Sequence, residues 1–417
     1  MLYNIAYNKQ LITMNIKASF FLARTTIARG NKGTLAMTIL IMTLAYVNLI
    51  FISSVFGGIV EAINEQSINN LYGNIVIAPA DDEVYIENKY AINSIDTIPG
   101  IIASSAHYVN NTVISYDANN DGRDVQQGKW IIKSVNVEDE IKVTQISQSI
   151  IEGEYLEDSD KDEIIIGKEI AGGHGGDLDH LSLGGVYVGD KIDVQFNNGI
   201  KRTYTIKGIF STKNSQADQM AFITTKEMES VIGVHNLASE IIIKIDELGQ
   251  EDKYIEQIRQ TGLRNEDIKT WKELTGFTSS ASKSFTMISV ILGIIGTIVA
   301  GVTIFIIIFV SIVNKRKQIG ILKAIGMEKS TIIFSFVMQA IFYAIIGIIF
   351  GIAIILFAVR PFFIDNPLDF PVGWVSLKIT FDIIRISNIS LIIAALIGGF
   401  IPAFRGTKES ILDTIWG

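Results

Sequence analysis

Two acidic loops carry the side chains best suited to hold a metal ion. The first, "DANNDGRD", places Asp117, Asn119 and Asp121 at the alternating positions of a calcium-binding loop. Such a loop closes with a bidentate glutamate at its twelfth position, where this chain has Gly128. A solvated turn rich in Asp and Asn accounts for the segment without a metal. A weak external Ca²⁺ site is kept as the alternative.

The second loop, "GGHGGDLDHL", gathers His174, Asp177, Asp179 and His180. Imidazole and carboxylate groups are ligands that transition metals accept. The glycines leave this loop without a stiff frame, and the spacing matches no tight set of ligands. We therefore expect a surface loop rather than a metal site.

Catalytic and nucleotide-binding patterns are missing from the sequence. The nearest approach to a phosphate-binding loop, "GGVYVGDK", has Asp190 where the lysine would stand, and an acid there repels a phosphate. The chain has no cysteine, four histidines and no G-x-S-x-G elbow for a nucleophilic serine. We expect neither enzymatic activity nor a cofactor in this chain.

Apolar residues concentrate in four runs, at 35–60, 285–313, 331–359 and roughly 388–404. The first three are long enough to cross a bilayer, and the fourth is near the lower limit of about 17 residues. Uncharged runs of this length are not typical of a soluble core. The predicted fold class is a membrane α-helical protein with four transmembrane helices.

Charge predicts how these runs are oriented. Residues 61–283 carry 37 acidic and 20 basic side chains, a net charge of −17, whereas the rest of the chain has a net charge of +9. Basic short segments stay on the cytoplasmic side, so we expect both termini and the 314–330 loop inside a cell membrane. The 360–387 loop, rich in prolines and aromatics, is then an outer loop near the bilayer surface.

Residues 61–283 form a predicted extracytoplasmic domain, inserted between the first and second spans. Its pattern is α+β, because short β-branched runs are bounded by Gly, Asn and Asp. The runs predicted as strands are "NIVIAPA", "KWIIKSVNV", "DEIIIG", "KIDVQF", "KRTYTIKGIF", "QMAFITT" and "SEIIIKI". The stretches "TKEMESVIG" and "GQEDKYIEQIRQTG" have helical spacing.

The ends of this domain are predicted to continue the flanking spans as a helical stalk. Ile63, Ser67 and Leu71 fall at helical spacing beyond the first span. Residues 271–284, which include Ser280, lead into the second span without a proline. In a dimer, we expect Ser67 and Ser280 to face their twins across the axis.

The spans themselves lack the side chains of an ion-coupled carrier. They contain no Asp, Glu, Lys or Arg, which such a carrier would be expected to use. Gly347 and Gly351, four apart in the third span, allow close approach of two helices. Packing within one chain and packing between two copies both remain open.

The loop "NKRKQIGILKAIGMEKS" contains more than an orientation signal. Its five cations set topology, but its aliphatic residues and repeated Ile-Gly step need another reason. With the third span behind it, the loop resembles the cytoplasmic loop of the MacB/LolC/FtsX-type permeases, a basic stretch followed by E-I-G-x-x-K/R-A-h-G with h apolar. Gln318 replaces the glutamate. The matching residues are Ile319, Gly320, Lys323, Ala324, Ile325 and Gly326.

The resemblance extends over nearly the whole chain. "IDTIPGI", "IIEGEYL", "DEIIIGKEIA" and "VGDKIDVQF" with "YTIKGIF" are similar to the periplasmic core of the family and follow its order. The C-terminal "IPAFRGTKESILDTI" is similar to the closing P-A-x-R-A…P-h-E-A-L motif of the family. Gly406 and Ile411 depart from it. The related positions are Pro402, Ala403, Arg405, Asp413 and Ile415.

The resemblance implies the permease subunit of an ABC transporter. It would dimerise with a second copy or a related permease and act with a separate cytosolic ATPase, which binds ATP and Mg²⁺. The 314–330 loop is then an ATPase-coupling helix that presents Ile319, Leu322 and Ile325 to an apolar groove. Gly326 ends this helix so that the chain can turn back into the membrane.

The leading function is mechanotransmission, in which the ATPase moves the extracytoplasmic domain to export or extract an amphiphilic substrate. A lipoprotein, a peptide or a lipophilic small molecule would qualify. The alternative is an FtsX-like regulator that activates an external hydrolase without cargo, and a receptor without an ATPase fits the loop badly. Membrane lipids and an external adaptor or hydrolase are the other partners considered, and no nucleic acid is expected.

The expected segments are 1–34 (interfacial), 35–60 (first span), 61–283 (outer domain), 284–313 (second span), 314–330 (coupling loop), 331–359 (third span), 360–387 (outer loop), 388–404 (fourth span) and 405–417 (tail).

Overall fold

The computed structural model describes residues 17–80, 83–119, 121–175, 179–264, 266–370 and 373–408, without the side chains of residues 277–279. The chain divides into two compact units. The helical unit comprises Met1–Val60, Ser284–Leu368 and Val375–Gly417, and the α+β unit comprises Glu61–Lys283 and Asp369–Trp374.

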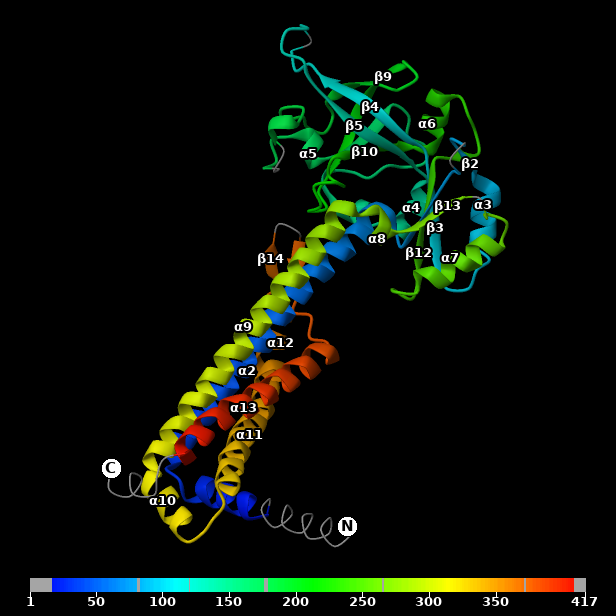
Figure 1. Cartoon of the computed structure of the whole chain (residues 1–417). Coiled ribbons are helices and arrows are strands. Elements are labelled where there is room, and N and C mark those ends of the chain that lie inside the picture. Colours follow the sequence, from blue (N-terminus) through cyan, green and yellow to red (C-terminus); the bar gives the residue numbers. More distant parts are fainter. Residues whose placement is uncertain are drawn as a thin grey trace. The chain divides into compact units, whose positions relative to one another are not determined.

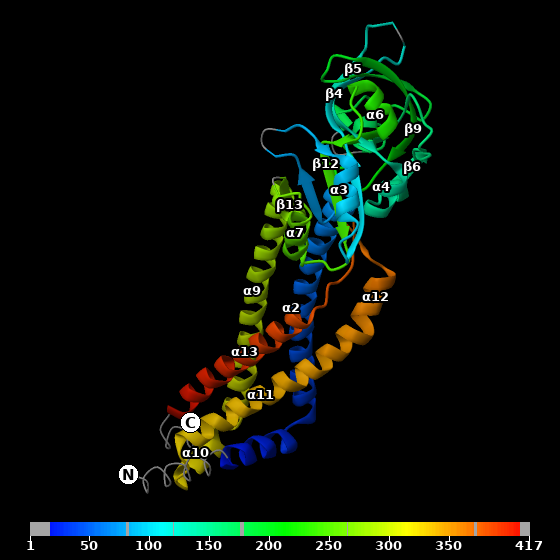
Figure 2. The same cartoon turned by 90° about the vertical axis from the view of Figure 1, so that its right-hand side faces the viewer.

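The helical unit is built from long apolar helices (Figures 1 and 2). Within the described residues, four helical stretches are long and apolar enough to cross a membrane. They contain α2 (Lys32–Ser67), α9 (Gly276–Asn314), α11 (Lys329–Ile354) and α13 (Phe381–Lys408). Helix α11 continues through the π-helical turn η4 (Ile355–Val359) into α12 (Arg360–Asp365). The predicted number of long apolar helices is confirmed for this part of the chain.

Several helix ends differ from those predicted. Helix α2 continues past residue 60, and α13 begins at Phe381 rather than near residue 388. The first turns of α13 contain Asp382 and Arg385, whose side chains pair at 3.0 Å. Such a pair supports a helix although it lowers the local hydropathy. The predicted 360–387 loop therefore contains α12, the start of α13 and the hairpin of β14 (Leu368–Phe370) and β15 (Gly373–Val375).

Small residues let α2 and α11 approach each other closely within one chain. A Cβ added at Gly347 would lie 2.9 Å from the Cβ of Met42, and one added at Gly351 would overlap the ring of Tyr46. Met42 and Tyr46 are fully buried. This glycine pair thus serves packing inside one chain, which is one of the two uses that the sequence left open.

The larger sheet of the α+β unit closes on itself. Its order is β6-β9-β7-β10-β5-β4-β8, and the long strand β9 pairs with β8 along its first half and with β7 along its second. Closure leaves β6 at the edge, and the interior is filled by buried side chains such as Ile132 and Tyr204. The strands are β4 (Val109–Tyr116), β5 (Gln126–Val135), β6 (Ile150–Gly153), β7 (Glu163–Gly167), β8 (Lys191–Gln195), β9 (Lys201–Phe210) and β10 (Met220–Thr224).

A smaller antiparallel sheet of this unit has the order β13-β1-β12-β3. Helices α3 and α7 lie beside it (Figure 1) and bury apolar side chains such as Ile95, Tyr254 and Ile258 in its core. Its elements are β1 (Ile75–Ala78), α3 (Asn88–Ile95), β3 (Ile101–His107), β12 (Glu240–Ile245), α7 (Glu251–Gln260) and β13 (Asp267–Thr270). Further elements of the unit are η1 (Ile68–Tyr72), β2 (Ile86–Glu87), α4 (Val137–Val143), η2 (Ile146–Ser149), α5 (Lys168–Ala171), η3 (Asp179–Leu181), α6 (Thr225–Ile232), β11 (Leu237–Ala238) and α8 (Trp271–Leu274).

The predicted α+β pattern is confirmed run by run. Each of the seven predicted strand runs contains a strand, and both predicted helices form, as α6 and α7. One run ends early, because Asn136 caps α4 by accepting the N–H of Glu138 at 3.1 Å. Strands β3 and β4 were not predicted.

The tip of the hairpin of β14 and β15, Asp369–Trp374, belongs to the α+β unit. The ammonium group of Lys213 lies 2.7 Å from a carboxylate oxygen of Asp369 and 4.5 Å from the ring centre of Trp374. The ring of Trp374 thus stacks under a lysine of the same unit, and the position of the 360–387 loop near the bilayer surface stays a prediction.

Candidate functional site

A short basic helix, α10 (Arg316–Ala324), follows α9 and precedes α11. Gly326 ends it with a φ of +90°. The N–H of Gly326 donates to the carbonyl of Lys323, and the N–H of Met327 donates to the carbonyl of Leu322, both at 3.0 Å. This pattern is a Schellman motif, which glycine adopts without a Cβ penalty. The predicted helix and its stop at Gly326 are confirmed.

Helix α10 has one buried and one exposed apolar side. Ile319 is 3% exposed and belongs to the same buried cluster as Ile332 and Phe336 of α11. Ile321 and Ile325 are 56% and 72% exposed. The expectation that Ile319 enters a groove on a partner is therefore corrected. Ile319 fastens α10 to its own unit, and the apolar side chains available to a partner are Ile321 and Ile325.

The remaining predicted coupling residues differ in their exposure. Gly320 is buried, and Leu322 and Lys323 are half-buried. The helix and its flanks form a basic surface, in which Glu328 is the acid and the cations are Lys315, Arg316, Lys317, Lys323 and Lys329. An apolar centre with a basic rim is complementary to an apolar groove with an acidic border.

The residues predicted for the stalk have different environments. Ile63 and Ser67 of α2, and Leu71 of η1, are 5% or less exposed. The hydroxyl of Ser67 donates to the carbonyl of Ile63 at 3.0 Å. The expectation that Ser67 faces a second copy is therefore corrected, because it is buried inside the α+β unit. Ser280 of α9, by contrast, is exposed.

The second arm of the predicted stalk is interrupted. Helix α8 ends at Leu274, its C-cap Thr275 has a ψ of 54°, outside the helical region, and α9 begins at Gly276. The predicted continuous helix from residue 271 is therefore corrected to one that starts at Gly276. Beyond this break, the side chains of Asn64 on α2 and Ser282 on α9 lie 3.3 Å apart. The two arms thus contact each other inside the α+β unit.

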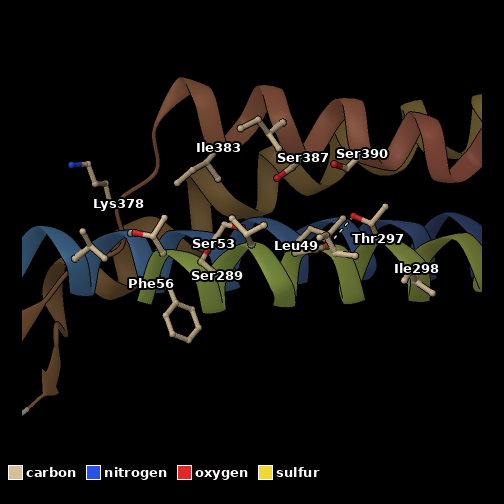
Figure 3. Close-up of a pocket in the computed structure, with 17 residues that line it drawn as sticks. Leu49, Ser53, Phe56, Ser289, Thr297, Ile298, Lys378, Ile383, Ser387 and Ser390 are labelled. Atoms are coloured by element: carbon tan, nitrogen blue, oxygen red, sulfur yellow. Dashed lines mark hydrogen bonds between the residues drawn. The ribbon is translucent and has the colours of Figure 1, made fainter. Parts of the chain in front are cut away.

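Helices α2, α9 and α13 line an open cavity of about 610 Å³ within the helical unit. Figure 3 shows Ser387 and Ser390 on α13 facing α2 and α9, which contribute Ser53 and Ser289, with Lys378 at one end. The rest of the wall is mainly aliphatic. The sequence offered no sign of this cavity, because its hydroxyl groups are scattered over three separate apolar runs.

In the candidate calcium loop, the carboxylates accept hydrogen bonds from backbone N–H groups of the same loop. The carboxylate of Asp117 accepts the N–H groups of Asn119 at 3.3 Å and Gly122 at 2.7 Å, and that of Asp121 accepts the N–H of Arg123 at 3.0 Å. These contacts are those of an Asx-rich turn. The weak Ca²⁺ site stays a prediction.

The histidine-rich loop shows no convergence of ligands in its described part. Asp177 lies outside the described residues. The carboxylate of Asp179 accepts the N–H of Gly173 at 2.8 Å, and Nδ1 of His174 lies 3.6 Å from Glu152. Among the residues that the structure describes, no three His, Cys, Asp or Glu side chains are grouped to hold a metal ion.

A buried ionic network, which sequence reasoning missed, joins the two sheets of the α+β unit. His107 ends β3, with its Nε2 2.7 Å from Glu140 of α4 and its Nδ1 3.1 Å from Glu240 of β12. Lys133 of β5 pairs with Glu240 at 2.6 Å. Elements of the small sheet, the large sheet and the helix between them therefore meet at one set of charges.

The network is charge-balanced in spite of its burial. Burial disfavours a charge on His107, but the neighbouring carboxylates of Glu140 and Glu240 outweigh it and raise its pKa to about 9. Burial also disfavours ionised Glu240, but Lys133 and His107 outweigh it and lower its pKa to about 2. Two cations thus face two carboxylates. Removing one member would leave the others buried without compensation.

Two family models match this sequence. Residues 35–261 match the MacB-like periplasmic core domain, and residues 290–411 match the FtsX-like permease C-terminal domain. The first match alone covers more than half of the chain. The chain belongs to the MacB/FtsX-like family of ABC transporter permeases.

Relatives of this permease agree with that assignment. It is 26% identical over 277 residues to an uncharacterised ABC transporter permease of Methanocaldococcus jannaschii, and the match spans 64% of this chain and 65% of the relative. The extracellular domain of the noncanonic ABC-type transporter YknZ from Gram-positive bacteria aligns with 45% of this chain and 90% of its own, at 14% identity and a TM-score of 0.33. The periplasmic region of MacB from Actinobacillus actinomycetemcomitans aligns with 52% and 96%, at 10% identity and a TM-score of 0.35. These structural scores are low, so the assignment rests on the sequence matches.

The C-terminal motif of this permease lies partly within the described residues. Pro402 and Ala403 are buried in α13, whereas Asp413 and Ile415 lie outside the described part. Gly406, which departs from the alanine usual in the family, lies against α9: an added Cβ would come 2.5 Å from Ile312. The close approach of these helices accounts for the smaller residue.

Proposed function

We propose that this permease is the transmembrane subunit of an ABC transporter and works with a separate ATPase, which binds ATP and Mg²⁺. The observation that carries the proposal is α10, on which Ile321 and Ile325 are exposed while Ile319 is buried. Exposed aliphatic side chains grouped on a basic helix are typical of a protein interface. An apolar groove on a cytosolic ATPase would cover them.

We infer the topology from the distribution of charge. The basic helix α10 and both termini are cytoplasmic, and the acidic α+β unit is on the outside of a cell membrane. A cysteine introduced at exposed Asn119 should react with an impermeant thiol reagent on intact cells, whereas one at exposed Lys317 should react only after permeabilisation. The chain has no native cysteine to confuse the result. Reversed labelling would contradict the topology.

A second permease, identical or related, would complete the transporter. Helix α9 supports this inference, since few of its described side chains are buried. Its exposed side chains include Ile291, Ile295, Val299 and Ile306. A face of this kind packs against lipid or against a helix of the second copy.

In the proposed mechanism, ATP binding draws the two α10 helices together, and α2 and α9 pass the movement to the α+β unit. Both helices enter that unit without a proline, and they contact each other there through Asn64 and Ser282. The moving unit then expels or extracts an amphiphilic substrate. No ion path is needed, because the apolar runs carry no charged side chain.

Breaking α2 should uncouple the two ends of this mechanism. Ile63→Pro removes a backbone hydrogen bond and kinks the helix, at a cost of about 3 kcal/mol. We expect normal insertion and normal ATPase association, but at least a tenfold loss of ATP-dependent release of a labelled lipopeptide from vesicles. Ile63→Leu, which conserves volume at this buried site, should retain release. Full release by the proline variant would exclude transmission through α2.

A regulator of an external hydrolase is the second candidate function. The observation that favours it is an exposed apolar group formed by Ile151, Tyr187 and Val188 next to the edge strand β6. Such an edge is a place where an external protein can dock. ATP-dependent activation of a bound hydrolase, without release of labelled lipopeptide, would favour this function over transport.

A further inference from the structure

Two cavities of the helical unit adjoin along α9 and differ in polarity. The hydroxyl-lined cavity of about 610 Å³ described above shares Thr297 and Ile298 with a second cavity of about 300 Å³ between α9 and α13. Apart from Thr297, the second cavity is lined by glycine, alanine and large apolar side chains, among them Gly301, Phe305 and Ile397. Both parts of the combined groove are mainly apolar, but the first part, called the polar half below, carries several hydroxyl groups, whereas the second, the apolar half, carries only that of Thr297.

The hydroxyl groups of the first cavity are available to a ligand. A serine inside a membrane helix usually donates to the carbonyl four residues before it, as Thr297 does to Gly293 at 2.8 Å. Within the described residues, the hydroxyls of Ser53, Ser289, Ser387 and Ser390 have no hydrogen-bond partner. These four groups, which come from three helices, face one space (Figure 3).

The dimensions of the groove fit one acyl chain with a polar end. Its wall on α9 runs from Thr286 to Phe305, a rise of about 28 Å at 1.5 Å per residue. This length is close to the roughly 30 Å of the whole hydrocarbon core, so the groove is long enough for one acyl chain and the polar group next to it. The volumes are within the range of about 300–1,000 Å³ usual for small-molecule sites. No side chain of the apolar half can pair with a charge.

We propose that this groove binds an acyl-chain amphiphile. The ester or amide carbonyls next to the chain accept hydrogen bonds from Ser387, Ser390 and their neighbours, and the chain itself lies against Gly301 and Ile397. The amphiphile is either a bilayer lipid or the cargo, which share this chemistry. The inference that it is the cargo rests on the proposed function, whereas the binding itself does not.

Photolabelling of the full-length permease in nanodiscs tests the proposal. The probe is a palmitoyl lysophosphatidylcholine with a diazirine at the chain end. We expect labels to concentrate on Phe305 and Ile397 in the apolar half, at least tenfold above exposed Ile291 outside the groove. Equal labelling of all lipid-facing positions would overturn the proposal. So would disulfide formation between two copies through a cysteine at Ile294, which would mean that a second permease fills the groove.

Matched variants separate binding from folding. Gly293→Leu fills the polar half, where an added Cβ meets no atom within 4 Å, and should reduce labelling at least tenfold. Val299→Leu enlarges an exposed position of the same helix outside both cavities and should leave labelling unchanged. Equal labelling of the two variants would overturn the proposal.

A second pair of measurements tests the role of the hydroxyls. The double variant Ser387→Ala and Ser390→Ala should lower labelling by the ester probe several-fold but not by its ether-linked analogue, which lacks the carbonyl. An identical effect on both probes would overturn this part.

Addition of ATP before irradiation then distinguishes cargo from a bilayer lipid. Cargo leaves the groove during ATP turnover, so that labelling falls, whereas a bilayer lipid stays and labelling is unchanged. If the groove binds the probe but no ATP-dependent release occurs with active ATPase, the proposed transport function fails and the site stands.

Discussion

Replacing His107 with glutamine is expected to destabilise the α+β unit by about 3–5 kcal/mol, the usual cost of breaking a buried ion pair. Glutamine cannot carry the charge that faces Glu140 and Glu240, which lie 2.7 and 3.1 Å from the imidazole. Of the donors that the structure describes for the Glu140 carboxylate, which is 1% exposed, the hydroxyls of Ser105 and Thr144 would remain. Hydrogen exchange of the β12 and α4 amides in the full-length protein measures the loss.

The chain provides its own control in His235, which pairs with Glu229 at 3.0 Å but is 75% exposed. His235→Gln should change stability by less than about 0.5 kcal/mol, because surface pairs contribute little. Equal effects of the two substitutions would contradict a special role for the buried network.

The same network gives the stability a defined pH dependence. The pKa of His107 is about 9 in the folded chain, against 6.5 for an ordinary histidine. Stabilisation by its charge is therefore complete below about pH 6.5 and is lost as the pH rises through 9, by on the order of 3 kcal/mol. His107→Gln should be flat across this window, and an unchanged slope in that variant would contradict the assignment.

Placing a carboxylate on the exposed side of α10 is expected to abolish co-purification of the ATPase. Ile325→Asp or Ile321→Asp would bury a charge in the proposed apolar groove, which costs several kcal/mol. Each 1.4 kcal/mol is a factor of ten in affinity, so we expect at least a hundredfold weakening with normal insertion of the permease. Ile319→Asp is not a clean probe, because Ile319 is buried in the helical unit.

Gln318→Glu is the matched control for these substitutions. It adds the same negative charge at an exposed polar position of the same helix, and should leave co-purification intact. Unchanged co-purification of both isoleucine variants would reduce α10 to an orientation signal and remove the main support for the proposed function.

Part of the α+β fold followed from sequence because some strands are almost wholly aliphatic. The run "EIIIG" became β7 and "EIIIKI" became β12. Strands β3 and β4 were not predicted from the sequence because they bury polar residues, such as Ser105 and Thr112. Their hydroxyls are satisfied by distant groups, Glu140 and the carbonyl of Trp130. The pattern of apolar residues in a sequence does not indicate hydrogen-bond partners that come together only in the folded chain.

In the candidate site, too, the sequence predicted local features but not those that depend on tertiary packing. The sequence indicated that α10 forms and stops at Gly326, because local backbone chemistry decides this. It did not indicate that Ile319 and Ser67 are buried by their own units. Periodicity marks which face of a helix is apolar but not what covers that face.

The position of β1 between β12 and β13 has a consequence for biogenesis. Strand β1 leaves the ribosome soon after α2, but its partners are Ile241–Ile243 and Asp267–Thr270. The small sheet therefore cannot close until almost the entire α+β unit has been made, and such long-range pairing folds slowly. Because α9 follows β13 after a short helix, closure of this sheet also brings the start of α9 to the end of α2, where Asn64 meets Ser282. Sheet closure thus brings the ends of α2 and α9 together within the α+β unit, and a chain truncated before β13 should lack this contact and be open to quality-control proteolysis.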